Sequence, residues 1–195
     1  LYVITDEIYE YFRYDGREHI SFASLPEMRE RTLTLGGFSK TFSITGWRIG
    51  YLLGSAELCH KLGHIHDLVY VCAPAPLQLG VARGLDQLPP QFYEALAREY
   101  TRKREKLCGA LQQAGIVPHV PQGAYYVLAD ARAVPGSSAK AKALALLGAS
   151  GVAAVPGSAF FAGTRGDDLL RFSYAKREPE LDEACRRLAA CRFSA

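Results

Sequence analysis

The first third of the chain alternates short apolar runs with stretches of helical periodicity. The runs at residues 1–5, 32–35 and 47–53 are typical of strands. This alternation predicts β/α units that form a mostly parallel sheet with helices. The first run, Leu1-Tyr2-Val3-Ile4-Thr5, is almost wholly apolar, so we expect a strand that is buried on both faces. Because the chain opens directly on this strand, and with Leu rather than Met, we expect it to be the C-terminal part of a longer protein.

Helical patterns follow, and proline separates them. Ser55 is a typical N-cap and predicts a helix that runs to about Val71. The prolines within 72–76 end that helix, and a second helix is expected over 77–85. The longest pattern runs from about Gln91 to Ala114, with one apolar stripe, and Gly115 is a natural residue to end it.

The rest of the chain predicts a second, smaller α+β domain. We expect strands at 116–120, 125–130, 152–155 and 169–174, and helices at about 138–148 and 179–192. We therefore divide this α/β chain into part of a large domain (1–88), a bridging helix (89–115) and a small domain (116–195).

Composition narrows the classes of function. Of the 195 residues, 49% are hydrophobic and 22% charged, which is typical of a folded globular protein. The net charge is only +3 and no block of basic residues occurs, which argues against a nucleic-acid partner. No apolar run approaches the roughly 20 residues that span a bilayer, so no membrane partner is expected. The five scattered cysteines indicate reduced thiols and a cytoplasmic location.

The most informative segment is 36–51, GGFSKTFSITGWRIGY, which lies between two predicted strands. It places Lys40 between Phe38 and Phe42, and Arg48 eight residues further on. Apolar neighbours disfavour the charged ammonium and leave the amine available as a nucleophile toward carbonyl groups. For an isolated lysine, a side chain that merely extends to solvent from an ordinary loop is the commoner case. The surrounding motif therefore decides the interpretation.

That segment closely resembles the Schiff-base lysine motif of fold-type I pyridoxal-phosphate enzymes of the class I/II aminotransferase family. The shared pattern is Ser-Lys, a short aromatic and hydroxyl stretch, and then Gly-Trp-Arg-x-Gly. Three further segments match in the expected order: Asp6-Glu7-Ile8-Tyr9, Gly123-Ala124-Tyr125-Tyr126 and Leu170-Arg171-Phe172-Ser173. The resemblance covers essentially the whole chain. It implies the C-terminal part of a fold-type I large domain followed by the small domain.

The resemblance also implies how the cofactor, pyridoxal 5'-phosphate, is held. Lys40 would form the Schiff base and then carry the proton between the substrate α carbon and the cofactor. Asp6 would face the pyridine nitrogen, and Tyr9 would donate a hydrogen bond to the phenolic oxygen. Arg48 would clamp the phosphate, and Ser39 would add a hydroxyl. One common version of the motif has a serine at the position of Gly37, whose backbone N–H is the alternative donor here.

Arg171 would bind the α-carboxylate of the substrate by the same resemblance. A lone arginine in a strand is usually a surface residue. The alternation along 169–174 leaves open which face it occupies, because Leu169 and Ser173 share one face with Arg171 while apolar residues hold the other.

Two other clusters have simpler interpretations. His60 and His64 stand four residues apart on a predicted helix, but no further ligand set completes a metal site, so none is expected. The basic run at 102–106 is interspersed with glutamates, and it predicts a solvated helix face with i,i+4 or i,i+3 ion pairs.

The predicted function is transamination between an amino acid and a 2-oxo acid, with the parent protein a homodimer. β-Elimination on the same scaffold, and a non-enzymatic pyridoxal-phosphate-binding domain of a transcription regulator, are the alternatives. A third hypothesis, a lysine–carbonyl enzyme on another fold, predicts that Asp6, Tyr9 and Arg48 do not converge on Lys40. In the family, segments upstream of the region matched here supply further parts of the site and of the dimer interface. We therefore expect this chain alone to retain the cofactor weakly and to turn over poorly.

Overall fold

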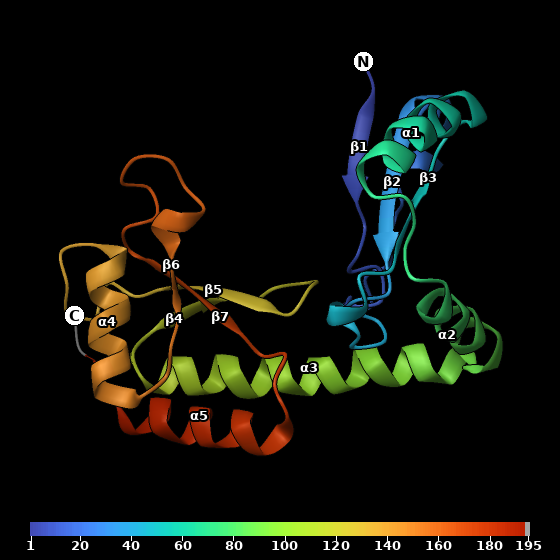
Figure 1. The fold of residues 1–195 in the computed structure, drawn as a ribbon. Coiled ribbons are helices and arrows are strands. Elements are labelled where there is room, and N and C mark those ends of the chain that lie inside the picture. Colours follow the sequence, from blue (N-terminus) through green and yellow to red (C-terminus); the bar gives the residue numbers. More distant parts are fainter. Residues whose placement is uncertain (194–195) are drawn as a thin grey trace. The chain divides into compact units, whose positions relative to one another are not determined.

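The computed structural model describes residues 1–193, which divide into two compact units. The first unit covers Leu1–Leu96, and the second begins at Ala97. Each unit is described by itself below, and Figure 1 shows the elements of both.

The first unit contains a three-stranded sheet in the order β1-β2-β3. The strands are β1 (Val3–Asp6), β2 (Thr32–Gly37) and β3 (Gly50–Leu53). β1 and β2 run parallel, whereas β3 returns antiparallel to β2. The expected strand over 47–53 begins only at Gly50, because a 3₁₀ turn occupies Thr45–Trp47 and Arg48 has a left-handed backbone with φ of 59°.

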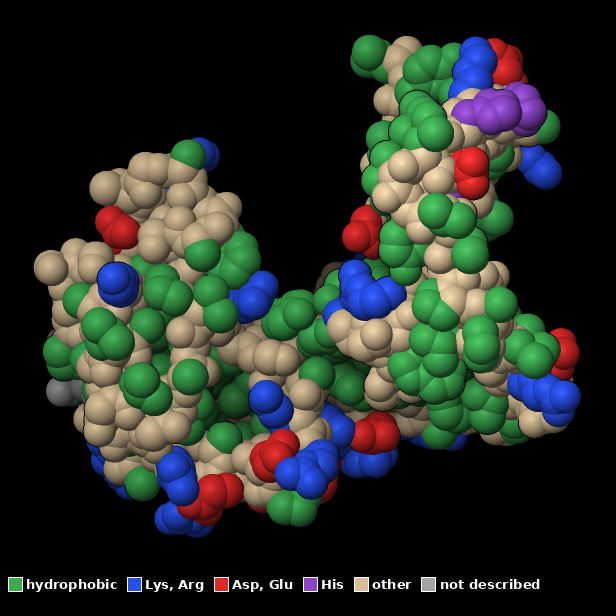
Figure 2. All heavy atoms as spheres, in the orientation of Figure 1, with side chains coloured by type: hydrophobic (Ala, Val, Ile, Leu, Met, Phe, Trp, Pro, Cys, Tyr) green, Lys and Arg blue, Asp and Glu red, His purple; other side chains and the backbone are tan. Residues whose placement is uncertain are grey.

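β1 lies at the edge of this sheet, and its outer face is open. Tyr2 and Ile4 are 71% and 68% exposed, so the expectation of a strand buried on both faces is wrong for the described part of the chain. The physical reason is that no described strand pairs with the outer edge of β1, and no described helix covers Ile4. Figure 2 shows how much hydrophobic surface of this unit remains open.

The predicted helices of the first unit are confirmed with small shifts at their ends. α1 spans Ala56–Val69, and the Ser55 hydroxyl caps it by accepting the N–H of Leu58 at 3.4 Å. α2 spans Ala75–Gln87 and begins two residues earlier than expected, because a proline is well tolerated in the first helical turn.

α3 (Pro90–Gln113) contains the boundary between the two units. Its end follows the expected pattern, with Gly115 in a left-handed conformation at φ of 83°. The N–H of Ile116 then bonds back to the carbonyl of Leu111 at 2.9 Å, as in a glycine-terminated helix.

The second unit is a four-stranded antiparallel sheet with helices, and five of the six predicted elements are present with small shifts, whereas the strand expected at 152–155 forms only at Val155–Pro156. The strands follow the order β4-β5-β7-β6: β4 (Val117–His119), β5 (Tyr126–Asp130), β7 (Leu169–Ser173) and β6 (Val155–Pro156). The helices are α4 (Ala139–Ser150) and α5 (Glu178–Ala190). Lys106 of α3 forms ion pairs with Glu178 and Asp182, which fasten α5 alongside α3 (Figure 1).

The core of the second unit lies between the sheet and the helices α3 and α5. Its fully or almost fully buried side chains come from all three: Leu107, Leu111, Val127, Leu170, Phe172, Leu181 and Leu188. On β7 the alternation is strict, since Leu170 and Phe172 are buried while Leu169, Arg171 and Ser173 lie on the half-exposed face. The alternation therefore places Arg171 on the face away from this core.

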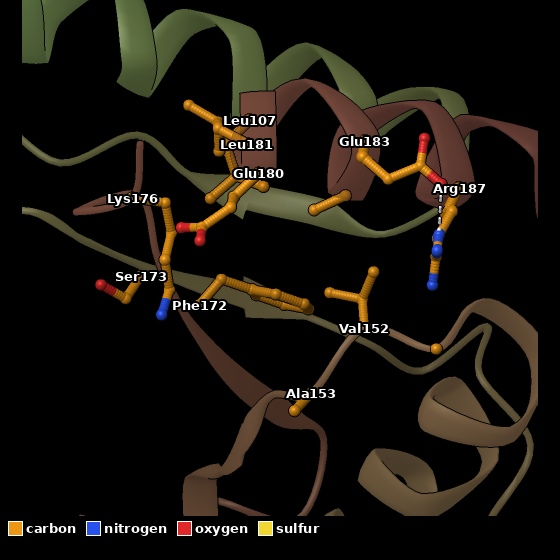
Figure 3. Close-up of a pocket in the computed structure, with 12 residues that line it drawn as sticks. Leu107, Val152, Ala153, Phe172, Ser173, Lys176, Glu180, Leu181, Glu183 and Arg187 are labelled. Atoms are coloured by element: carbon orange, nitrogen blue, oxygen red, sulfur yellow. Dashed lines mark hydrogen bonds and ion pairs between the residues drawn. The ribbon is translucent and has the colours of Figure 1, made fainter. Parts of the chain in front are cut away.

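A cavity of about 500 Å³ opens between α5 and the sheet (Figure 3). Its floor is apolar, with Leu107, Phe172 and Leu181, and an ion pair between Glu183 and Arg187 stands at its rim. None of the predicted site residues lines this cavity.

The basic run of α3 differs from the prediction. Lys103 and Arg104 are only 6% and 3% exposed, so the expected solvated face is wrong at these two positions. Both side chains interact with polar groups of the same unit, because a buried charge without such a partner is costly. Lys103 pairs with Glu99 at 2.5 Å, which is an i,i+4 pair of the expected kind, and Arg104 donates to the carbonyl of Pro121 at 2.9 Å.

Two findings concern the whole described chain. Within residues 1–193, no helix combines the length and the apolar character that crossing a membrane requires. All five cysteines are free thiols.

The core of the second unit gives a stability prediction. Leu111→Ala should lower the free energy of unfolding by about 2–5 kcal/mol, because it removes a fully buried side chain and leaves a cavity. Leu144→Ala is the matched control, since Leu144 is 59% exposed and should change stability by less than about 0.5 kcal/mol. Urea unfolding followed by circular dichroism measures both, and equal effects would contradict the assigned core.

Candidate active site

Sheet topology brings two loops of the first unit to one edge. The parallel strands β1 and β2 end there, with Asp6 opposite Leu35, and the antiparallel β3 begins there, with Gly50 opposite Gly37. Asp6 and the loop 38–49 therefore leave the sheet at the same edge. This is the edge at which open α/β sheets bind ligands.

The loop that carries Lys40 is fixed by its neighbours. Phe38 donates its N–H to Ile49 at 3.2 Å, and Phe42 donates to Phe38 at 3.0 Å. The rings of Phe38 and Phe42 stack with centroids 5.6 Å apart. Lys40 is half-buried between two buried hydroxyl residues, Ser39 and Thr41. The backbone of the lysine is thus held by short local bonds and by packing on both sides.

Arg48 closes the same loop from its other end. Its left-handed backbone ends the 3₁₀ turn, and one guanidinium nitrogen, Nη1, donates to the carbonyl of Thr45 at 3.0 Å. The side chain is exposed, and no carboxylate within residues 1–193 forms an ion pair with it. An exposed guanidinium that lacks an acidic partner in the described chain suits an anionic ligand.

Asp6 and Tyr9 occupy the turn that follows β1. The carboxylate of Asp6 is exposed, and its Oδ1 accepts the N–H of Ile8 at 3.2 Å. Tyr9 is half-buried, and its ring packs edge-on against Phe12 with centroids 5.9 Å apart. Phe12 is almost fully buried, so it anchors this turn to the first unit.

Glu7 is a site-supporting residue that the sequence analysis passed over. Its carboxylate accepts hydrogen bonds from His19, Ser21, Thr5 and the N–H of Phe22, at 2.8 to 3.1 Å. These bonds tie the loop after β1 back onto the strand end that presents Asp6. The signal was present in the sequence, because alternation along a strand places Glu7 on the face opposite Asp6.

The electrostatics of Glu7 follow from this cluster. Burial by itself would raise the pKa of the Glu7 carboxyl, but the hydrogen bonds from His19, Phe22, Ser21 and Thr5 outweigh it and hold the pKa below its ordinary value. Nearby, burial raises the pKa of Glu10 and raises that of Tyr51 to about 12.

A cavity of about 480 Å³ adjoins this cluster. Glu7, Glu10, His19, Thr32 and Tyr51 are among the residues that line it. Asp6, Lys40 and Arg48 do not line it, so this cavity is not the predicted site.

The second unit holds Arg171 in a different setting. Its guanidinium carbon lies 4.2 Å from the ring centroid of Tyr126 and 4.5 Å from that of Phe160. The turn at Gly123-Ala124, which precedes β5, is strained, with Ala124 at φ of 59°. The hydroxyl of Tyr174 donates to the carbonyl of Ala124 at 3.0 Å, which fixes this turn.

The structure therefore groups the predicted residues in two sets. Asp6, Tyr9, Ser39, Lys40 and Arg48 belong to loops at one edge of the first unit's sheet, and Arg171 belongs to the second unit. On α1, the Nε2 atoms of His60 and His64 lie 3.2 Å apart, and Figure 2 shows histidines gathered over this helix. Within residues 1–193, no group of three or more His, Cys, Asp or Glu side chains is arranged to hold a metal ion.

Comparison with known proteins gives consistent matches over nearly the whole chain. The family model described as aminotransferase class I and II matches residues 1–188. The chain is 34% identical to kynurenine–oxoglutarate transaminase of Dictyostelium discoideum, over 93% of this chain and 46% of that protein. It is 37% identical to aromatic-amino-acid aminotransferase 2 of Thermococcus litoralis, over 96% of this chain and 48% of that protein.

Among solved structures, N-succinyldiaminopimelate aminotransferase of Mycobacterium tuberculosis matches with a TM-score of 0.90 at 36% identity. That match covers 97% of this chain and 50% of the other. The chain thus spans about half the length of the relatives it matches.

The Glu7 cluster predicts a pH dependence of stability. The carboxyl binds a proton less readily in the folded state than in the unfolded chain, so its contribution is present above the ordinary pKa of 4.5 and is lost as the pH falls below it. At pH 7, Glu7→Gln should lower the free energy of unfolding by about 1–3 kcal/mol, because charge-assisted hydrogen bonds are lost.

Urea unfolding between pH 7 and pH 4 measures this effect. The difference between wild type and Glu7→Gln should shrink toward pH 4, whereas the exposed control Glu18→Gln should leave stability nearly unchanged throughout. A difference for Glu7→Gln that stays constant with pH would contradict the role assigned to the carboxylate.

Proposed function

This chain belongs to the class I and II aminotransferase family, and on that premise we propose that it carries the lysine-bearing part of a pyridoxal-phosphate-dependent aminotransferase. Its α/β fold is that of fold-type I enzymes, as the match to the mycobacterial aminotransferase shows. The observation that supports the proposal is that Asp6 and the loop that carries Lys40 and Arg48 leave one sheet at the same edge.

The side chains at this edge fit the cofactor by their chemistry. An amine at Lys40 suits an aldehyde, and the exposed Arg48 guanidinium suits a phosphate. A carboxylate at Asp6 suits a protonated pyridine nitrogen, and the hydroxyl of Tyr9 suits a phenolic oxygen. Each functional group of pyridoxal phosphate thus has a complementary side chain in the first unit. When bound, the cofactor supplies an electron-withdrawing ring that makes the α proton of an amino acid removable.

Each residue then has a definite task. The Nζ of Lys40 would hold the cofactor through its aldehyde group, and the freed amine would act as the base and acid that moves the α proton of the substrate. Asp6 would keep the ring nitrogen protonated, and Tyr9 would stabilise the phenolic oxygen as an anion. Arg48 binds the phosphate with the fork of its guanidinium, and the Ser39 hydroxyl or the N–H of Gly37 adds a hydrogen bond.

For the substrate, we assign the α-carboxylate to Arg171. A guanidinium binds a carboxylate through two parallel hydrogen bonds, and Arg171 lies on the half-exposed face of β7. The substrates would be an amino acid and a 2-oxo acid. The relatives above are named for amino-group transfer, which favours transamination over β-elimination or a regulatory role.

The open edge of β1 fits the shortness of the chain relative to its relatives. We propose that the natural polypeptide supplies further structure that covers Tyr2 and Ile4, and that it works as a homodimer in the cytoplasm. The present chain by itself should then retain the cofactor weakly.

The test is covalent trapping in the natural polypeptide that carries this chain. Borohydride should fix pyridoxal phosphate to the protein, and peptide mass mapping should place the label on Lys40. Lys40→Ala should abolish the label and lower turnover by at least about 10²–10⁴-fold, the range that a general acid–base group contributes.

Lys61→Ala is the matched control, because Lys61 is an exposed lysine on α1 that pairs with Glu57. It should leave both the label and the rate unchanged. A label that persists in Lys40→Ala would refute the proposed function.

A further inference from the structure

Two aromatic rings from separate parts of the chain lie against the guanidinium of Arg171. Tyr126 lies at the start of β5 and Phe160 directly after the 3₁₀ turn Gly157–Ala159, and their ring centroids are 4.2 and 4.5 Å from the guanidinium carbon. Stacking on an aromatic face is favourable for a guanidinium, because the negative face of the ring attracts the cation.

The register of the sheet explains why the ring of Tyr126 lies next to Arg171. Tyr126 pairs with Ser173, and Leu128 pairs with Arg171, so Tyr126 is a diagonal neighbour of the arginine on the adjacent strand. Both residues are half-buried and share one face of the sheet, since Val127 and Phe172 between them point into the core. Diagonal pairs on one face lie within reach of aromatic and long side chains.

A close approach of Gly157 and Gly166 explains why the ring of Phe160 lies next to Arg171. β6 pairs with β7, with Val155 opposite Arg171, and the chain then turns back through Gly157. A Cβ on Gly157 would lie 2.5 Å from the carbonyl oxygen of Gly166, so only glycine permits this approach. The N–H of Phe160 bonds to the carbonyl of Gly157 at 2.8 Å, which fixes the aromatic residue at the end of the turn.

The two ring contacts leave the charge of Arg171 available to a ligand. All N–H donors of a guanidinium lie in its plane, and neither ring carries an acidic group that would occupy them. No carboxylate among residues 1–193 forms an ion pair with Arg171. Fixing the plane of the guanidinium therefore fixes the plane in which a carboxylate is bound, and it removes rotational freedom before binding.

We propose that Phe160, with Tyr126, is a positioning residue that fixes the guanidinium plane of Arg171 for recognition of the substrate α-carboxylate. This inference rests on the proposed function, because it presumes that Arg171 is the carboxylate anchor. Phe160 acts through Arg171, and its contribution is specific to ligands that carry a carboxylate. The side chain of Phe160 is 47% exposed, so replacing it should leave the fold of the second unit intact.

The experiment uses a matched pair of small probes on the natural polypeptide loaded with pyridoxal phosphate. 2-Methylalanine carries an α-carboxylate and has no α proton to lose, and isopropylamine is the same amine without the carboxylate. The dissociation constant of each is read from the change in cofactor absorbance, and thermal unfolding checks that each variant is folded.

Phe160→Leu should weaken binding of 2-methylalanine by about 3- to 30-fold, the range expected for loss of a cation–π contact. Binding of isopropylamine should stay within about twofold of wild type, since that probe makes no use of the guanidinium plane. With a reactive amino acid, KM should rise while kcat changes by less than about twofold, because the lost interaction acts on binding. Phe160→Tyr keeps an aromatic face and should restore the affinity.

The neighbouring Phe161 provides a matched control. It is also an exposed phenylalanine, at 38%, and it has no contact with Arg171 among those found in the described chain. Phe161→Leu should therefore leave the affinity for both probes unchanged. Tyr126→Leu should resemble Phe160→Leu, and Tyr126→Phe should resemble wild type, which gives a second test on an independent strand.

The outcomes separate this inference from the function on which it rests. If Arg171→Leu leaves binding of 2-methylalanine unchanged, the assignment of the carboxylate anchor fails. If Arg171→Leu abolishes the preference for the carboxylate while Phe160→Leu behaves like Phe161→Leu, the positioning role is overturned and the anchor stands. If Phe160→Leu weakens both probes equally, the ring shapes the pocket in general, which also overturns the inference.

Discussion

The parallel pairing of β1 with β2 is the constraint on which the first unit's site depends. With Asp6 opposite Leu35, both strands end at one edge, and the reversal into β3 returns the chain to that edge at Gly50. A shift of β1 by one residue would exchange the faces of Asp6 and Glu7. The carboxylate with four hydrogen-bond donors would then lie on the exposed face, and the one with a single backbone donor would lie on the covered face. Register and hydrogen bonding therefore support the same arrangement.

Adjacent acids thus have different roles because of their surroundings. Glu7 accepts hydrogen bonds from His19, Ser21, Thr5 and a backbone N–H, so its carboxylate holds the loop that follows β1 in place. Asp6 meets only the N–H of Ile8 at one oxygen among the contacts found, and it stays exposed at the sheet edge. Glu7 holds the loop while Asp6 stays open to a ligand, because alternation sends their side chains to opposite faces.

In the second unit, too, some charged side chains are bound within the fold and another is left without an acidic partner in the described chain. Lys103 and Arg104 are buried and bound to Glu99 and to the carbonyl of Pro121, so they serve the packing of α3. Arg171 has no acidic partner in the described chain and contacts two aromatic rings, which hold it in place without neutralising its charge. A charge that is positioned but not neutralised is the kind that a ligand can use.

Much of this was readable from the sequence by itself, because it depends on local periodicity and on a specific motif. Hydrophobic spacing predicted the helices and nearly all the strands. Residue type predicted the N-cap at Ser55 and the helix end at Gly115, and the motif around Lys40 indicated the family. Tertiary structure alone decided the face of Arg171, the burial of Lys103 and Arg104, the exposure of Ile4 and the bonds of Glu7. These depend on which elements pack together, and residues far apart in the chain, such as Arg104 and Pro121 or Phe160 and Arg171, become neighbours only when the sheets and helices assemble.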